Sequence, residues 1–344
     1  MRKAFKNPKT RKFWLPVCLL YALLAVCCLL SFGVGRYGIA AQTIIDILLA
    51  KLGFITPYWE TAVETVVLNV RLPRILLAVM VGGSLAVSGA SYQTLFKNPM
   101  VSPAILGVSA GAGFGAALAM ILNALWWQIQ LTAFICGILA VFAAYVIAWV
   151  FGRQELTVMI LGGVIVSSLF GALLSIVKLM ADTDNALPSI VFWLMGSLGR
   201  GNMRDVLVML PALVFSLALL FIFRYQINTL SAGEDEAVTL GVNVRQVKTV
   251  VVVAATLLTV SAVSVCGIVG WVGLVVPHMA RMLTGASYHR LIITSFGLGG
   301  LFLLLVDDVV RGIPGVELPL GVLTALVGTP IFVALLGRVR RGWM

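Results

Sequence analysis

Long apolar runs alternate with short polar segments along nearly the whole chain. Because roughly 20 apolar residues in a helix cross ~30 Å of hydrocarbon, this pattern predicts an all-α polytopic membrane protein with about ten transmembrane helices. The predicted spans lie near residues 13–33, 73–96, 104–124, 131–151, 156–177, 206–223, 248–268, 271–283, 290–311 and 318–337. The eighth is too short to cross alone, so we expect it to pack among its neighbours or to be re-entrant.

The first span follows a basic arm at residues 1–12, a layout that a secretory signal peptide also has. The apolar run from Phe13 to Phe32 is long enough to span, however, and no A-x-A-type cleavage site closes it. We therefore interpret the run as a retained transmembrane helix behind a cytosolic arm.

Composition supports this class and excludes others. Hydrophobic residues make up 61% of the chain and charged residues 11%, and the mean hydropathy is +1.08, which does not describe a soluble domain with one core. In a soluble protein the net charge of +11 would suggest nucleic acid. Here the basic residues belong to loops that anchor helices at anionic lipids, so we expect membrane lipids and no nucleic acid as partners.

The distribution of lysine and arginine predicts the orientation. With an even number of spans, both basic termini lie on one side of the membrane. The eight basic residues that then fall on the other side are Arg36, Lys51, Arg71, Arg74, Lys178, Arg200, Arg204 and Arg311. Because these are only a third of the 24 basic residues, the bias supports cytosolic termini.

Glycine motifs indicate whether the chain can bind a nucleotide and how its helices pack. The chain has no G-x-x-x-x-G-K-[ST] phosphate loop, so any nucleotide hydrolysis belongs to a partner chain. Gly107, Gly111 and Gly115 form two overlapping G-x-x-x-G steps, which let transmembrane helices approach closely. We interpret them as packing residues and not as a dinucleotide site, since no predicted strand precedes them.

The most acidic stretch of the chain, residues 231–243, lies in a predicted cytosolic loop. Cytosolic loops tend to be basic, so a short acidic helix bracketed by Gly233 and Gly241 is unusual for a plain connector. We predict that this segment docks another protein. The alternative is a solvated loop helix whose acids are favoured by the helix dipole.

Few residues suggest chemistry inside the membrane. Asp307 lies four residues before Arg311, a spacing that brings helix side chains together. Carboxylates within spans are usually functional, so Asp308 either faces a pathway or meets water near the outer end. The two histidines, His278 and His289, have no metal-type spacing, and we predict no metal site.

Seven motifs occur in order along the chain and together carry a resemblance. They are Arg71-Leu72-Pro73-Arg74; Ser88-Gly89-Ala90 to Phe96-x-Asn98-Pro99; Leu106-Gly107-Val108-Ser109-Ala110-Gly111-Ala112; Trp193-Leu194-Met195-Gly196-Ser197; Gly233-Glu234 to Leu240-Gly241; Gly273-Leu274-Val275-Val276-Pro277-His278-x-x-Arg281; and Glu317-Leu318-Pro319-x-Gly321 to Gly328-x-Pro330. In this order and spacing the chain resembles the permease subunits of ABC importers for iron-siderophores, haem and cobalamin.

The resemblance implies a BtuC-like permease fold of the type II importers, with residues 1–344 as one transmembrane domain in the cytoplasmic (inner) membrane of a bacterium or archaeon. It implies a homodimer with the pathway along its two-fold axis, two cytosolic ATPases that hold ATP and Mg²⁺, and a periplasmic or lipid-anchored substrate-binding protein. The chain itself is then no enzyme and binds no cofactor.

The same resemblance assigns residues. Residues 230–244 correspond to the coupling helices that seat in the ATPase, and the residues concerned are Gly233, Glu234, Ala237, Leu240 and Gly241. The outer arginines Arg71, Arg74 and Arg311 correspond to those that pair with glutamates of the binding protein. We expect them to be exposed, because exposed guanidinium groups offer planar forks to carboxylates; anchoring to lipid headgroups is the alternative.

Leu156 and Thr157 correspond, by a loose alignment, to the constriction of the cytosolic gate. Arg200 and Arg204, near Lys178, form an outer basic group that favours an anionic ferric siderophore or haem over cobalamin. With Asp308 they are possible pathway or entrance residues. We expect a ferric siderophore or similar bulky iron chelate first, then haem or cobalamin, with an oxyanion last. An ion-coupled secondary transporter that uses Asp307 and Asp308 as a relay is the alternative of another class, and a non-transporting receptor is a third.

Overall fold

A computed structural model describes residues 8–51, 53, 56–152, 155–313, 315 and 318–339, with side chains described from Trp14 to Leu335 within these ranges. Several positions used above lie outside this description: residues 1–7 of the basic arm, the side chains of residues 8–13, and Glu317. The basic residues at the carboxyl terminus, Arg338, Arg340 and Arg341, have no described side chains.

Every regular element in the described part of the chain is helical. The helices are α1 (Pro8–Ser31), α2 (Ala41–Lys51), α3 (Thr61–Thr65), α4 (Leu72–Leu95), α5 (Val108–Ile121), α6 (Trp126–Gly152), α7 (Leu156–Met180), α8 (Ala186–Met195), α9 (Met203–Ile222), α10 (Arg224–Ala232), α11 (Glu234–Thr239), α12 (Val244–Cys266), α13 (Val272–Thr284), α14 (Tyr288–Gly312) and α15 (Leu320–Val339). A π-helical turn, Val66–Arg71, joins α3 to α4, and a 3₁₀ turn, Pro103–Leu106, precedes α5.

Each of the ten predicted spans is a helix. Seven continuous helices among the described residues are long and apolar enough to cross a membrane, and the one that contains α3, the π turn and α4 runs from Thr61 to Leu95. The other three predicted spans are the shorter α5, α13 and α15. The eighth predicted span is confirmed to be short, since the corresponding helix α13 has only 13 residues. Helix α8, whose ten residues follow a polar turn, was not among the predicted spans.

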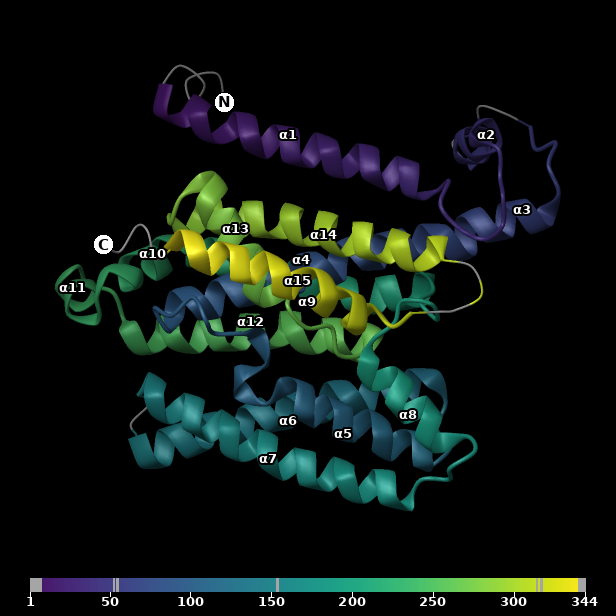
Figure 1. Cartoon of the computed structure of the whole chain (residues 1–344). Helices are drawn as coiled ribbons and strands as arrows, with labels where there is room; N and C mark the ends of the chain where they lie inside the picture. The colour runs from purple at the N-terminus through teal and green to yellow at the C-terminus, as the bar shows by residue number, and fades with distance from the viewer. Residues whose placement is uncertain are drawn as a thin grey trace.

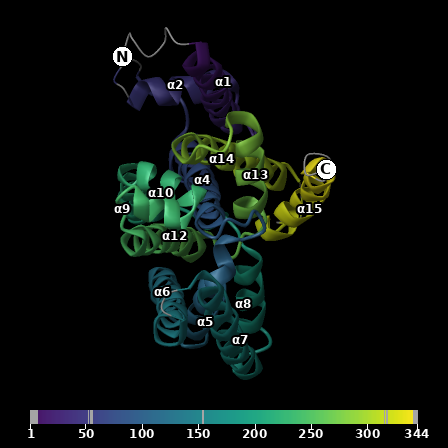
Figure 2. The same cartoon turned by 90° about the vertical axis from the view of Figure 1, so that its left-hand side faces the viewer.

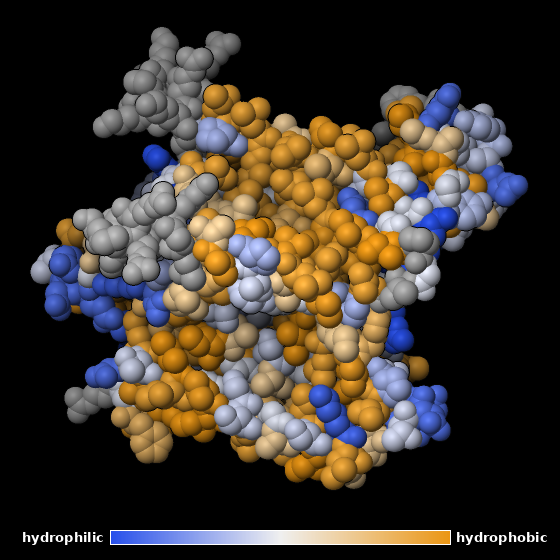
Figure 3. All heavy atoms as spheres, viewed as in Figure 1, coloured by the Kyte–Doolittle hydropathy of each residue, from blue (hydrophilic) through white to orange (hydrophobic). Residues whose placement is uncertain are grey.

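The long helices lie nearly parallel in one bundle with two polar ends, whereas the short α2 lies across their direction (Figures 1 and 2). The start of α1 and the end of α15 lie at the same end as α10 and α11, which we call the acidic end; α2, α3 and the end of α14 lie at the other, the arginine end (Figure 1). Orange hydrophobic side chains cover the surface between them, and blue hydrophilic ones gather at both ends (Figure 3). A membrane protein is expected to have such a surface, because hydrocarbon favours apolar side chains.

Helix α4 is the centre of the bundle. It lies between α14 and α13 on one side and α12 and α9 on the other, with α5, α6 and α7 as a separate layer beyond α12 (Figure 2). Most of the α4 span is buried, whereas α1, α6 and α7 are mostly exposed to the surroundings. This burial explains why α4 carries small residues at its contacts rather than a lipid-facing stripe.

Glycines set the closest helix contacts. A Cβ atom at Gly82 of α4 would lie 2.1 Å from the carbonyl oxygen of Gly299 of α14, and a Cβ at Gly299 would lie 2.3 Å from that of Gly82. The predicted packing role is confirmed for Gly111 and Gly115 of α5, whose Cβ positions fall against backbone oxygens of α6. Gly107 has a different role, since its φ of +87° caps the start of α5.

We predict that Gly82→Ala destabilises the chain by about 1–3 kcal/mol, because the added methyl group overpacks the contact between α4 and α14. Chemical unfolding in a mild detergent measures this. The matched control is Gly171→Ala in α7, where no atom lies within 4 Å of the new Cβ and the higher helix propensity of alanine should stabilise the helix by up to about 1 kcal/mol. Equal effects of the two changes would contradict the prediction.

Candidate functional site

The arginine end gathers the three arginines predicted to dock a binding protein. Arg71 lies at the last position of the π turn, and Arg74 follows within the first turn of α4. Arg311 lies in the last turn of α14. The π turn adds a residue to the helical repeat, which rotates Arg71 relative to a regular helix and directs it toward the segment after α1.

Contrary to the expectation of exposure, all three arginines are engaged within the chain. Arg71 is buried, and its two terminal nitrogens donate to the carbonyl oxygens of Phe32 and Tyr37. It therefore braces the end of α1 against α4. The premise that these side chains are exposed is wrong, because a long guanidinium side chain folds back wherever its own chain offers oxygen acceptors. Their docking role stays a prediction.

Asp307 is the acceptor that holds the other two arginines. It is fully buried, and its carboxylate accepts from Arg74 Nε at 3.0 Å and from Arg74 Nη2 at 2.9 Å. Arg311 Nε lies 3.0 Å from Asp307 Oδ2, so the predicted contact between residues four apart is confirmed. The carboxylate thus joins α4 to α14 and compensates buried positive charge, which makes a buried ion pair tolerable.

Asp308 extends this cluster to α1. Ser31 Oγ donates to Asp308 Oδ1 at 2.6 Å, and Arg311 pairs with the same carboxylate oxygen. Arg311 also donates to the hydroxyl and carbonyl oxygens of Ser31. Asp308 is mostly buried, and its contacts with Ser31 and Arg311 make it a link between α14 and α1; its pathway or entrance role stays a prediction.

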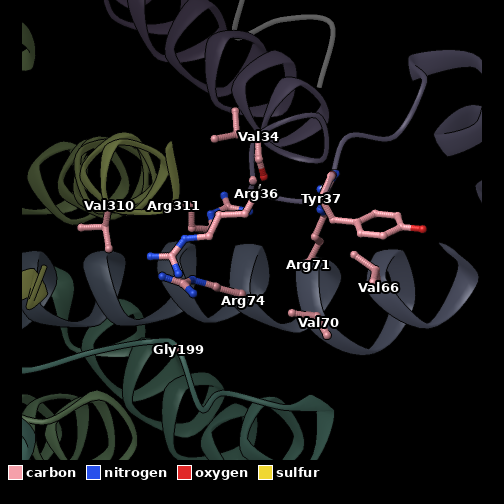
Figure 4. A pocket seen from close by; sticks show the side chains of 11 residues that line it. Val34, Arg36, Tyr37, Val66, Val70, Arg71, Arg74, Gly199, Val310 and Arg311 are labelled. Atoms are coloured by element: carbon pink, nitrogen blue, oxygen red, sulfur yellow. Dashed lines mark hydrogen bonds between the residues drawn. The ribbon is translucent and has the colours of Figure 1, made fainter. Parts of the chain in front are cut away.

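A cavity of about 300 Å³ opens beside the cluster (Figure 4). Arg36, Arg71, Arg74 and Arg311 all contribute to its wall, together with uncharged residues such as Tyr37 and Val70. Arg36 is exposed and extends from the segment after α1 toward Arg74 (Figure 4). Among the described residues that line the cavity four are arginines and none is a carboxylate, so this lining is positively charged and suits a carboxylate or another anion. Sequence reasoning placed Arg36 on this side but gave it no role.

The acidic end carries the predicted coupling segment as two short helices, α10 and α11, with Gly233 extended between them. Leu240 and the neighbouring Val238 are highly exposed apolar side chains, which suits contact with another protein. Ala237, however, is fully buried in the chain's own core, so it supports the segment and presents no surface.

Two polar contacts fix this segment to the bundle. Glu234 pairs with Lys248 of α12 at 2.8 Å, and Asn228 of α10 accepts from the backbone N–H of Tyr288 at 3.0 Å. Gly241 has a φ of +76°, a conformation that glycine adopts without strain, and it ends α11. The segment is therefore attached to α12 and α14, so a displacement of the segment would also displace these helices.

The remaining predicted residues lie at the expected ends. Leu156 and Thr157 begin α7 at the acidic end, with Leu156 half-buried and Thr157 exposed (Figure 1). Arg200 and Arg204 are exposed at the arginine end, and the Arg200 guanidinium lies 5.3 Å from the Trp126 ring. No contact in the structure tests the predicted gate, pathway or entrance roles.

Asp205 is a buried carboxylate that the sequence analysis missed. It caps α9 with Asn202, each side chain accepting from the other's backbone N–H, and it accepts from Gln130 Nε2 at 2.9 Å. The N-x-x-D spacing of a capping box was the available signal. Among the described residues no group of three or more His, Cys, Asp and Glu could hold a metal ion, and the predicted lack of a metal site stays a prediction.

Comparisons with known proteins agree with this arrangement. The model of the FecCD transport family matches residues 23–338. The molybdate import system permease MolB of Haemophilus influenzae is 36% identical over 94% of this chain and 96% of its own length. The cobalamin import system permease BtuC of Halobacterium salinarum is 40% identical over 83% of this chain and 76% of its own.

A solved structure shares the fold. An inward-facing putative metal-chelate type ABC transporter superposes with a TM-score of 0.83 at 34% identity, covering 94% of this chain and 98% of its own. The predicted resemblance and fold class are thereby confirmed.

We predict that Asp307→Asn destabilises the chain by about 3–5 kcal/mol, because it leaves two mostly buried arginines without their shared counter-charge. Unfolding in detergent measures the loss. Glu64→Gln is the control, since its partner Lys51 is exposed and such surface pairs contribute about 1 kcal/mol or less. A loss at Asp307 no larger than at Glu64 would show that the cluster does not hold α4 and α14 together.

Proposed function

The chain belongs to the FecCD transport family, and from this premise we propose that it is the permease subunit of an ATP-driven importer that carries a ferric siderophore or a similar bulky iron chelate. Two copies form the pathway at their interface, and both chain termini face the cytosol. ATP and Mg²⁺ bind to two partner ATPases, and an extracytoplasmic protein delivers the substrate.

The observation that carries this proposal is the difference between the two ends of the bundle. The arginine end presents a positively charged cavity, and the opposite end presents exposed Val238 and Leu240 on a segment tied to α12 and α14. A carrier that works alone needs neither surface. An importer needs one end to receive a delivery protein and the other to receive the mechanical step of an ATPase.

Two further findings support an ABC importer over an ion-coupled carrier. A relay carboxylate must bind and release its ion, whereas Asp307 is held by both Arg74 and Arg311 and Asp308 by Arg311 and Ser31. The family relation supplies the second, since MolB and BtuC are named import system permeases.

Two observations favour a metal chelate as the substrate class. The solved relative is a metal-chelate type ABC transporter, and the exposed Arg200 and Arg204 would attract an anionic chelate. Cobalamin and haem remain alternatives of the same bulky kind. Molybdate is a second candidate on one specific observation, the 36% identity with MolB over 94% of this chain.

Reconstitution tests the function. Proteoliposomes that contain this chain with its cognate ATPase and binding protein should take up a ferric siderophore only when ATP is supplied, and uptake should persist when ion gradients are collapsed. Uptake that stops with the gradient and ignores ATP would establish the secondary carrier. ATP-driven uptake of molybdate without chelate uptake would replace the substrate and keep the mechanism.

A binding experiment on the purified chain should show that the two ends of the bundle bind different partners. We expect Arg36→Gln to weaken capture of the binding protein at least about tenfold while the ATPase still binds, because a charged partner loses about 1.4 kcal/mol or more of interaction. We expect Leu240→Glu to do the opposite, because a charge in an apolar contact is poorly solvated.

Each of the two variants has a matched control. Lys51→Gln removes an exposed charge at the arginine end that is already paired with Glu64, and capture of the binding protein should be unchanged. Leu122→Glu alters an exposed leucine next to α5, away from the acidic end, and should spare the ATPase. If Arg36→Gln and Lys51→Gln behave alike, the cavity is not the docking site.

A further inference from the structure

A pocket of about 310 Å³ lies toward the arginine end, where α5 ends, α6 begins and α12 ends against α8. Three aromatic side chains, those of Trp126, Phe192 and Trp193, line it together with Arg200. Among its described lining residues none is acidic, and none also lines the cavity beside Arg36. It is therefore a second hollow of the chain, with a lining of aromatic rings and one cation.

The backbone around this pocket is held by segments distant in the chain. The N–H of Ser197 donates to the carbonyl oxygen of Cys266 at 2.8 Å. A Cβ atom at Gly267 would lie only 2.1 Å from the carbonyl oxygen of Trp193, so α12 approaches α8 this closely only at a glycine. The Trp193 ring packs with alanines of α5 and α6 and is 6% exposed. The backbone of the pocket is thus fixed, and only side chains can adjust to a ligand.

Two hydrogen-bond donors in the wall of the pocket lack an acceptor. The indole Nε1 atoms of Trp126 and Trp193 are buried, and neither has a hydrogen-bond partner among the described residues. An indole N–H can only donate, and a buried polar group without a partner calls for an explanation such as a water, an ion or a ligand. Because both rings line the pocket, a molecule bound there is the candidate acceptor.

Arg200 supplies the charge of the pocket. Its side chain is exposed, and its guanidinium carbon lies 5.3 Å from the centre of the Trp126 ring. No ion pair in the described part of the chain involves Arg200, whereas Arg74 and Arg311 both pair with Asp307. A guanidinium without a counter-charge offers a planar fork that matches a carboxylate.

The lining selects a ligand by charge and by shape. Aromatic cages commonly bind a cation, but here the guanidinium of Arg200 already lies beside Trp126 and no described lining residue is acidic, so a second cation would be repelled. A phosphate group has no flat apolar face to place against the rings, whereas a benzene ring stacks on them. The volume is at the small end of the range for ligand pockets, roughly 300–1,000 Å³, which suits a single ring.

We infer that this pocket binds a small aromatic carboxylate of the size of benzoate. The ligand ring lies among Trp126, Phe192 and Trp193, and its carboxylate pairs with Arg200 and accepts from the indole N–H groups. Because both Nε1 atoms are covered in this structure, the indole rings tilt slightly to present them. The site uses one copy of the chain and no ATPase, so it does not depend on the proposed transport function.

Fluorine NMR of para-fluorobenzoate with the purified full-length chain tests the site. We expect saturable binding that Arg200→Gln weakens about tenfold or more, because a charge-assisted hydrogen bond is lost. Trp193→Phe should weaken it about threefold or more, because phenylalanine keeps a ring and removes the donor. Arg204→Gln and Trp127→Phe are the matched controls, since both residues are exposed and lie outside the pocket lining; binding should stay within about twofold of wild type.

Related probes test the ligand class. Cyclohexanecarboxylate keeps the charge without the flat ring, and benzyl alcohol keeps the ring without the charge, so each should bind about fivefold or more weakly than para-fluorobenzoate. Glycerol phosphate carries the phosphate of a lipid headgroup. If it binds as tightly as para-fluorobenzoate, the pocket is a headgroup site and the inference is overturned. Equal affinity of wild type and Arg200→Gln for para-fluorobenzoate would overturn it as well.

Thermal unfolding separates loss of the site from loss of the fold. para-Fluorobenzoate should raise the melting midpoint of wild type and of Arg204→Gln, because a ligand that binds the folded chain stabilises it. It should leave the midpoint of Arg200→Gln unchanged. Arg200 is exposed, so this comparison decides the outcome even where Trp193→Phe does not fold. An equal rise in Arg200→Gln would refute the site.

Discussion

The contact between α4 and α14 is the constraint on which the other features depend. Gly82 and Gly299 bring the two backbones so close that neither position has space for a side chain. In hydrocarbon the hydrophobic effect does not drive helices together, so close packing of small residues takes over that role. At the arginine end the same two helices are joined by Asp307, which holds Arg74 of α4 and Arg311 of α14.

This pairing also positions the surface at the arginine end. Ser31 and Asp308 attach α1 to α14, and Arg71 attaches the segment after α1 to α4. With three arginines fixed in this way, Arg36 remains as the exposed cation beside the cavity. A buried carboxylate thus has two consequences, since it holds two helices together and leaves a cavity wall that is rich in positive charge.

A different kind of constraint operates where α8, α12 and α15 meet. Backbone outside a helix is tolerated within a membrane only where protein covers it or a cavity adjoins it. The first condition holds here, because three crossing segments satisfy each other's backbone groups. The short α13 follows from the same arrangement, since the five-residue turn takes up the length that a longer helix would use.

The helical class, the ten segments and the packing role of Gly111 and Gly115 were predictable from the amino-acid order, because apolar run length and small-residue spacing act locally along one helix. The amino-acid order also placed Asp307 within reach of Arg311, a contact inside one helix turn. The burial of Arg71 and Arg311, the inward position of Ala237, the place of Arg36 beside the cavity and the backbone conformation of Trp271 could be read from the folded chain alone. Each of these depends on acceptors or backbone supplied by segments distant in the chain, such as Phe32 for Arg71 and α15 for Trp271, and no local pattern encodes which distant segment will lie alongside.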